Sequence, residues 1–201
     1  DQGTSSTKTI IFNTKGEVLA KDTAILETSY LEGGFVEQDP EGIYQNVLLS
    51  VRVCLANFTA NGGKIEDIQS AGISNQRETF IVWDKSGKAI APAVVWQCKR
   101  SIAICEDLNA KNGIAAEVKN KTGLIIDPYF SGTKLIWLNQ NNQEVKDKIQ
   151  SGEAYFGTVD TWLLYKLTNG QKYLTDYTNA SRTLLFNLEK LQWDKQLIET
   201  F

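Results

Sequence analysis

Residues 1–26 read DQGTSSTKTIIFNTKGEVLAKDTAIL. A β-branched run over 7–13, a turn at Gly16 and a second extended run over 17–26 predict a β-hairpin. The first eight residues form a turn rich in glycine and hydroxyl groups that leads into the first strand. Such a turn can direct backbone N–H groups and hydroxyls at phosphate oxygens, and an acidic residue at its start suits Mg²⁺. Ordinary turns have the same composition, so both interpretations stay open here.

A long helix is predicted after the hairpin. Asp39 is suited to be its N-cap, Pro40 its first residue, and the Asn-Gly-Gly run at 61–63 its end. Apolar residues recur along it at helical spacing, as a core-facing stripe requires. They are Ile43, Val47, Leu48, Val51, Cys54, Leu55 and Phe58.

The rest of the chain mixes strands and helices. We expect a strand over 68–74, a hairpin of 79–83 with 90–96, and a mainly helical segment from Lys99 onward. Its breaks are predicted at Gly113, Gly123, Asp127, Pro128 and Gly152, and its last two helices are expected to be capped by Asp160 and Asp194. This order of elements predicts an α/β domain around a mixed sheet.

Composition excludes several classes of function. The chain has 24 acidic and 21 basic residues, so no excess of positive charge is available to neutralise a phosphate backbone, which disfavours nucleic-acid binding. It has no His, which excludes Ser-His and Cys-His nucleophiles and His-based metal sites. Its three cysteines include no Cys-x-x-Cys pair, which fits a reducing cytosol. No apolar run approaches the roughly 20 residues of a membrane span.

Two further segments carry groups suited to a small polar ligand. In 75–79, the donors of Arg77 and the acceptors of Glu78 could bind vicinal hydroxyls, although a surface ion pair is the simpler interpretation. Trp96 and Tyr129 could form the walls of a pocket, with the Tyr hydroxyl orienting the ligand, or they could be core residues.

Several segments together resemble the FGGY carbohydrate kinases, and among these the glycerol kinases in particular. The resemblance runs from one end of the chain to the other. It rests on the turn at 1–8 and on NQRET (75–79), VVWQC (94–98), YFSGTKLIWLNQN (129–141), FGTVDTW (156–162) and TDYTNASRTLLF (175–186).

For the first turn, the resemblance implies a role in ATP binding. Thr4, Ser5 and Ser6 would lie at the ATP phosphates, and Asp1 would help to hold Mg²⁺. Lys8 stands where the family commonly has Arg, which keeps the charge but loses the bidentate geometry.

For the other segments, the resemblance implies a glycerol site. Arg77, Glu78 and Tyr129 would hydrogen-bond the glycerol hydroxyls, and Trp96 would cover the apolar side. The implied reaction is transfer of the γ-phosphoryl group of ATP to glycerol. The general base would be an Asp on a second domain, so no catalytic residue is expected in residues 1–201.

The implied fold is the ribonuclease-H-like or actin-like ATPase fold. We expect residues 1–201 to be the N-terminal, substrate-binding domain, truncated at both ends and without the second ATPase domain. The full-length enzyme is expected to be a cytoplasmic homo-oligomer. Two alternatives stay open: an FGGY kinase that acts on a longer sugar, and a non-catalytic actin-like module that binds nucleotides or partner proteins.

Overall fold

A computed structural model describes residues 1–201, which divide into two compact units. Unit 1 comprises Asp1–Thr28 and Asp39–Gln76, and unit 2 comprises Ser29–Gln38 and Arg77–Phe201. None of the helices has both the length and the apolar character that crossing a membrane would need.

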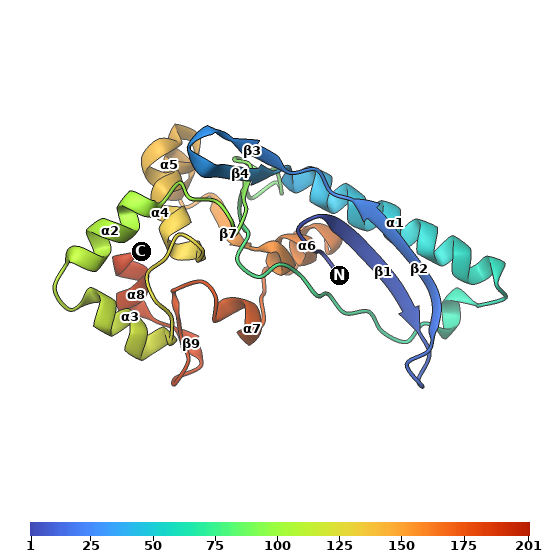
Figure 1. Cartoon of the computed structure of the whole chain (residues 1–201). Helices are drawn as coiled ribbons and strands as arrows, with labels where there is room; N and C mark the ends of the chain where they lie inside the picture. The colour runs from blue at the N-terminus through green and yellow to red at the C-terminus, as the bar shows by residue number, and fades with distance from the viewer. The chain divides into compact units, whose positions relative to one another are not determined.

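Unit 1 is a β-hairpin covered by one long helix (Figure 1). Strands β1 (Ser6–Phe12) and β2 (Val18–Ile25) pair antiparallel, and helix α1 (Pro40–Ala60) packs against both. The contact is apolar, through Ala20, Cys54 and Phe58. Oδ1 of Asp39 accepts the Glu41 N–H at 3.0 Å, so the predicted hairpin, helix and N-cap are confirmed.

Two predictions for unit 1 are wrong. In α1, Ser50 is fully buried, whereas Val51 is 37% exposed and lies outside the core-facing stripe. Residues 68–74 form no strand: after a short 3-10 helix (Ile65–Asp67), their chain runs irregularly to an isolated parallel bridge between Gln2 and Asn75. A strand needs a ladder of backbone partners, and a single bridge does not supply one.

Unit 2 contains a five-stranded sheet in the order β3-β4-β6-β5-β7, and its pairings are antiparallel. Its strands are β3 (Ser29–Leu31), β4 (Phe35–Gln38), β5 (Phe80–Asp84), β6 (Ala93–Val94) and β7 (Ala154–Thr158), with a 3-10 turn (Glu32–Gly34) between β3 and β4.

The predicted hairpin of 79–83 with 90–96 is present, but its second strand is shorter than predicted and comprises only β6 (Ala93–Val94). Pro92 directly precedes β6 and has no N–H for the ladder. The pattern analysis missed β7, which pairs with β5 from Phe80↔Thr158 to Asp84↔Ala154. This strand is only five residues long, contains Gly157 and lies between helices, so it lacks a clear alternating signature.

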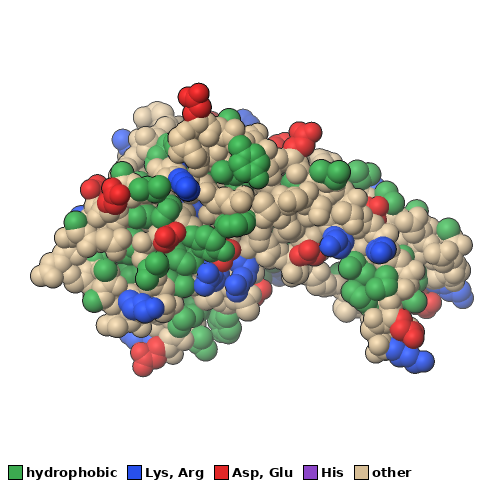
Figure 2. All heavy atoms as spheres, in the orientation of Figure 1, with side chains coloured by type: hydrophobic (Ala, Val, Ile, Leu, Met, Phe, Trp, Pro, Cys, Tyr) green, Lys and Arg blue, Asp and Glu red, His purple; other side chains and the backbone are tan.

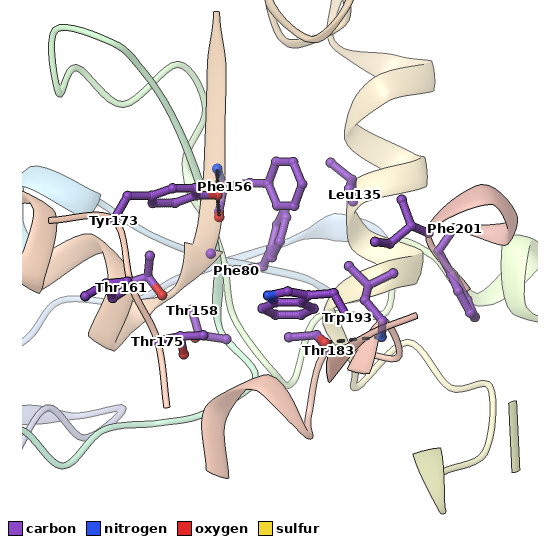
Figure 3. Close-up of a pocket in the computed structure, with 14 residues that line it drawn as sticks. Phe80, Leu135, Phe156, Thr158, Thr161, Tyr173, Thr175, Thr183, Trp193 and Phe201 are labelled. Atoms are coloured by element: carbon purple, nitrogen blue, oxygen red, sulfur yellow. Dashed lines mark hydrogen bonds between the residues drawn. The ribbon is translucent and has the colours of Figure 1, made fainter. Parts of the chain in front are cut away.

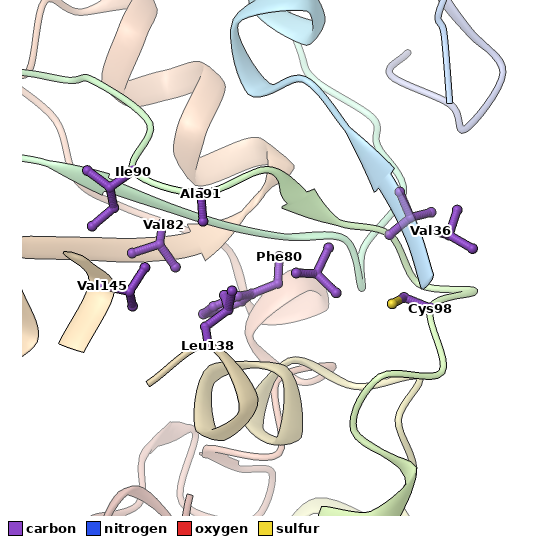
Figure 4. Close-up of a cluster of buried hydrophobic side chains, with 10 residues drawn as sticks. Val36, Phe80, Val82, Ile90, Ala91, Cys98, Leu138 and Val145 are labelled. Atoms are coloured by element: carbon purple, nitrogen blue, oxygen red, sulfur yellow. The ribbon is translucent and has the colours of Figure 1, made fainter. Parts of the chain in front are cut away.

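Helices and a small hairpin complete unit 2: α2 (Ile102–Ala110), α3 (Ile114–Thr122), α4 (Ser131–Asn141), α5 (Gln143–Gln150), α6 (Val159–Leu167), α7 (Tyr177–Ala180), β8 (Phe186–Asn187), β9 (Gln192–Trp193) and α8 (Lys195–Thr200). The breaks predicted at Gly113 and Gly123 are confirmed, and both glycines have the positive φ that favours this residue. The main core joins sheet residues such as Phe80 and Val82 to Leu138 of α4 and Val145 of α5 (Figure 4).

The predicted cap of the last helix is confirmed, and that of α6 is wrong. Asp194 accepts the N–H groups of Gln196 and Leu197 at 3.1 and 3.2 Å. Asp160 instead lies inside the first turn of α6, where its buried carboxylate accepts hydrogen bonds from two threonine hydroxyls. Burial raises its pKa. The N-cap position belongs to Thr158.

Candidate active site

The turn at residues 1–8, hereafter the Gly3 turn, is a small loop closed by its own backbone. The Gly3 N–H donates to the Ser6 carbonyl at 3.0 Å, and the Thr7 hydroxyl donates to the buried Gln2 side chain at 2.6 Å. Thr4 donates to Gln76 Oε1 at 3.3 Å. The turn is therefore held in place by its own hydrogen bonds, with the Ser5 side chain exposed.

The main chains of the two charged candidates of this turn, Asp1 and Lys8, pair with each other. The Lys8 N–H donates to the Asp1 carbonyl at 2.8 Å, and the Asp1 amino group donates to the Lys8 carbonyl at 2.7 Å. No group of three or more His, Cys, Asp and Glu side chains is arranged to hold a metal ion. A single carboxylate fits Mg²⁺ only together with waters and substrate phosphates.

In unit 2, Glu78 is a buried carboxylate held by an arginine. Its residue is 5% exposed, and its Oε1 accepts the Nε–H of Arg182 at 2.7 Å. The Arg182 guanidinium in turn lies 5.0 Å from the centre of the Phe130 ring. A buried carboxylate requires such a partner, because desolvation strongly disfavours an unpaired charge.

Tyr129 and Trp96 complete this group of side chains. Their rings meet edge to face, with centroids 5.5 Å apart. Burial raises the pKa of the Tyr129 phenol, and the Glu78 charge and its hydrogen bond with the phenol raise it further. The charges of Arg182 and Arg77 lower it. The cluster of Glu78, Trp96, Tyr129 and Arg182, hereafter the Glu78 cluster, therefore presents a carboxylate and a hydroxyl beside an indole.

Of the predicted site residues in unit 2, three lie together and the fourth, Arg77, is exposed. Glu78, Tyr129 and Trp96 lie together, although none of them neighbours the others in sequence. The Arg77 side chain is exposed, and its charge acts on the Tyr129 hydroxyl. The simpler interpretation, a surface ion pair of Arg77 with Glu78, is wrong, because Glu78 is buried and pairs with Arg182.

Pattern reasoning assigned no role to Arg182. The residue lies within the segment TDYTNASRTLLF, so the family resemblance covers its position. A single arginine in a loop has no periodicity or spacing that would have marked it, and only the fold brings it to Glu78.

An apolar hollow of about 370 Å³ is a separate feature of unit 2 (Figure 3). Its wall includes Phe80, Leu135, Phe156, Trp193 and Phe201, and hydrophobic side chains also gather on the neighbouring surface near α4 and α8 (Figure 2). Three of its threonine hydroxyls, those of Thr158, Thr175 and Thr183, already donate to protein oxygens. The wall of this hollow is therefore mostly apolar, which suits a polyol less well than the Glu78 cluster does.

Comparison with known proteins identifies the fold and the family. Residues 1–201 match the FGGY family of carbohydrate kinases, N-terminal domain. Glycerol kinase 1 of Thermotoga maritima is 46% identical over 202 residues, which cover 100% of this chain and 40% of the relative. A crystal structure of Plasmodium falciparum glycerol kinase with ADP has a TM-score of 0.95 and 36% identity, and the match covers 100% of this chain and 39% of that one.

A ligand-bound xylulose kinase from Lactobacillus acidophilus has a TM-score of 0.80 at 24% identity, with 99% of this chain and 38% of that chain covered, which shows the fold alone. The chain spans about 40% of the length of the curated relatives that it matches. The predicted α/β fold of the actin-like ATPases is confirmed. The chain belongs to the FGGY family of carbohydrate kinases, of which it carries the N-terminal domain.

Proposed function

We propose that the whole protein is a glycerol kinase, which transfers the γ-phosphoryl group of ATP to glycerol. The observation that carries this proposal is the Glu78 cluster, in which a buried, paired carboxylate lies beside a phenol and an indole. The 46% identity to a glycerol kinase over the full chain supports the same acceptor.

The chemistry of the Glu78 cluster suits a triol. Each hydroxyl of glycerol both donates and accepts, so its site needs acceptors and donors close together. Arg182 occupies Oε1 of Glu78, and the second carboxylate oxygen is the acceptor for one hydroxyl. The exposed Arg77 supplies donors for the others, and the phenol oxygen of Tyr129, whose O–H donates to Glu78, is a further acceptor. The half-buried Trp96 covers the carbon chain.

The Gly3 turn is proposed to bind the donor phosphates. Thr4, Ser5 and Ser6 contribute hydroxyls and backbone N–H groups, and Lys8 contributes a positive charge. Asp1 would hold Mg²⁺, whose charge, when the ion is bound, neutralises negative charge on the phosphates. The protein then acts by positioning and charge stabilisation, since phosphoryl transfer needs little covalent chemistry from it.

The wider organisation is also a proposal. Residues 1–201 would be the substrate-binding domain, and a second domain would carry the general base. The three free cysteines fit a reducing compartment such as the cytoplasm. The homo-oligomeric state of the full-length enzyme stays a prediction, to be measured by light scattering.

The test is a panel of acceptors assayed with the whole protein and ATP. Glycerol is expected to have the highest kcat/KM, and Tyr129→Phe is expected to lower that value about tenfold through one lost hydrogen bond. A higher kcat/KM for xylulose or gluconate would favour a sugar kinase instead. Polymerisation with ATP and no transfer to any acceptor would favour an actin-like module. Residues 1–201 alone are expected to transfer no phosphoryl group, and glycerol phosphorylation by them would contradict the proposed location of the base.

A further inference from the structure

A lysine at an unfavourable position lies next to the Glu78 cluster. Lys134 is fully buried, and it lies in the first turn of α4, where the helix dipole disfavours a cation. Buried lysines are rare unless they are paired. The energetic cost of burying this lysine must be offset by favourable contacts, and the proposed function gives the residue no role.

The contacts of Lys134 connect the two segments that carry the Glu78 cluster. Its Nζ donates to the carbonyl oxygen of Glu78 at 2.5 Å and to that of Tyr129 at 2.7 Å. Glu78 lies two residues before β5, and Tyr129 directly precedes the N-cap residue of α4. One side chain therefore fixes the backbone positions of the carboxylate and the phenol relative to each other.

These contacts are independent of the ion pair between Arg182 and Glu78. Arg182 binds the end of the Glu78 side chain, whereas Lys134 binds its main chain. Burial lowers the pKa of Lys134 to about 7, with Cys98, Glu78 and Asp127 opposing that shift and Arg100 adding to it. A neutral amine still has two N–H donors for its two carbonyl acceptors, so the contacts persist in either charge state.

We propose that Lys134 is a positioning residue for the acceptor, since it fixes the distance between the Glu78 carboxylate and the Tyr129 hydroxyl. This inference rests on the proposed function, because it takes these two groups as the binders of the polyol. It assigns the lysine to acceptor affinity rather than to contact with the phosphates of ATP.

The first test is Lys134→Met in the whole protein, which keeps the length of the side chain and removes its donors. The KM for glycerol is expected to rise about tenfold or more, with the KM for ATP changed less than about twofold. The matched control is Ser101→Ala, which removes the buried hydrogen bond between the hydroxyl of Ser101, the N-cap residue of α2, and that of Thr133 in α4. This control is expected to lower stability and leave both KM values unchanged.

A second measurement needs no substrate. With tyrosine labelled at ¹³Cζ, the Tyr129 resonance is assigned by its loss in Tyr129→Phe and followed against pH. Burial is the main cause of the raised Tyr129 pKa, and the nearby Glu78 adds to it. In Lys134→Met the contribution of Glu78 is expected to shrink and the pKa to fall toward its ordinary value, because Lys134 no longer joins the main chains of Glu78 and Tyr129. If the wild-type protein does not phosphorylate glycerol, the proposed function is wrong, but the Tyr129 titration still tests whether Lys134 positions Glu78 and Tyr129.

A folded Lys134→Met protein with an unchanged KM for glycerol and an unchanged Tyr129 titration would overturn the inference. Lys134→Gln is the second variant, since its amide keeps two donors on a shorter arm and so preserves the fold. It is expected to raise the KM for glycerol several-fold and to lower the pKa of Tyr129. Wild-type values for both quantities in this variant would overturn the inference as well.

Discussion

In unit 1, the residues proposed to bind phosphate, Thr4 to Ser6, are consecutive and are held by the backbone hydrogen bonds of a single small turn. In unit 2, Glu78 and Tyr129 come from distant segments and are held by the side chains of Lys134 and Arg182. The first site depends on local backbone geometry, and the second depends on buried charges brought together by the fold. Single substitutions should therefore damage the second site much more than the first.

The largest effect is expected for Glu78→Gln. It removes the charge of a buried carboxylate and leaves the Arg182 guanidinium without its ionic partner. Losing one member of a buried charge pair typically costs several kcal/mol, so kcat/KM for glycerol should fall about 100-fold, measured by a coupled assay. The matched control is Glu37→Gln, which breaks the pair of Glu37 with the buried Arg100. An equal loss in this control would contradict a specific role for Glu78.

The next effect concerns stability and its dependence on pH. Asp194 caps α8 and accepts hydrogen bonds from Lys121 and Asn187, and these bonds, Asn187 first, lower its pKa. A lowered pKa gives stability that is present above the unfolded-state value of about 4 and is lost as pH falls below it.

Asp194→Ala should therefore lower the free energy of unfolding, measured by urea denaturation, by about 1–2 kcal/mol at neutral pH and by less at acid pH. Ser86→Ala, which affects only an exposed turn next to Asp84, is the control for a general surface effect. A destabilisation by Asp194→Ala that is constant from pH 7 to pH 3 would contradict this account.

A smaller effect is expected for Arg182→Lys, which keeps the charge but loses the planar Nε donor that binds Glu78. The KM for glycerol should rise about tenfold, with the KM for ATP unchanged. Arg100→Lys is the control, because Arg100 makes an equally short ion pair with Glu37. An unchanged KM for glycerol in Arg182→Lys would show that charge alone suffices at this position.

The smallest effect is expected in the Gly3 turn. Lys8 is exposed, so its attraction for phosphate is screened by water and salt. Lys8→Ala should raise the KM for ATP about threefold at low salt and less at high salt, without changing the KM for glycerol. Lys15→Ala, an exposed lysine on the same hairpin, is the control. A 100-fold effect of Lys8→Ala would contradict the contrast between the two sites.

The same contrast explains how much the sequence could predict. The β1–β2 hairpin, α1 with its Asp39 cap, and the α8 cap at Asp194 depend on neighbouring residues, and all three were predicted. The strand β7 and the irregular path of 68–74 depend on which backbone partners tertiary structure provides, and neither was predicted.

The candidate site also divides into features that depend on local sequence and features that depend on the tertiary fold. Glu78, Tyr129 and Trp96 are candidate site residues because each lies in a segment that resembles the glycerol kinases. The contacts of Arg182 and Lys134 with Glu78 were not predicted, because their partner atoms lie in another segment or on the main chain. A buried lysine in a signature segment is indistinguishable in sequence from a solvated one, since burial is a property of the fold.

The most direct test of the central claim is a titration of the ¹³Cζ-tyrosine-labelled whole protein with glycerol. The Tyr129 resonance, assigned by Tyr129→Phe, is predicted to shift and saturate at the glycerol concentration that half-saturates turnover, and Glu78→Gln is predicted to abolish the shift. An enzyme that phosphorylates glycerol while its Tyr129 resonance stays unmoved would contradict the assignment of the Glu78 cluster as the acceptor site.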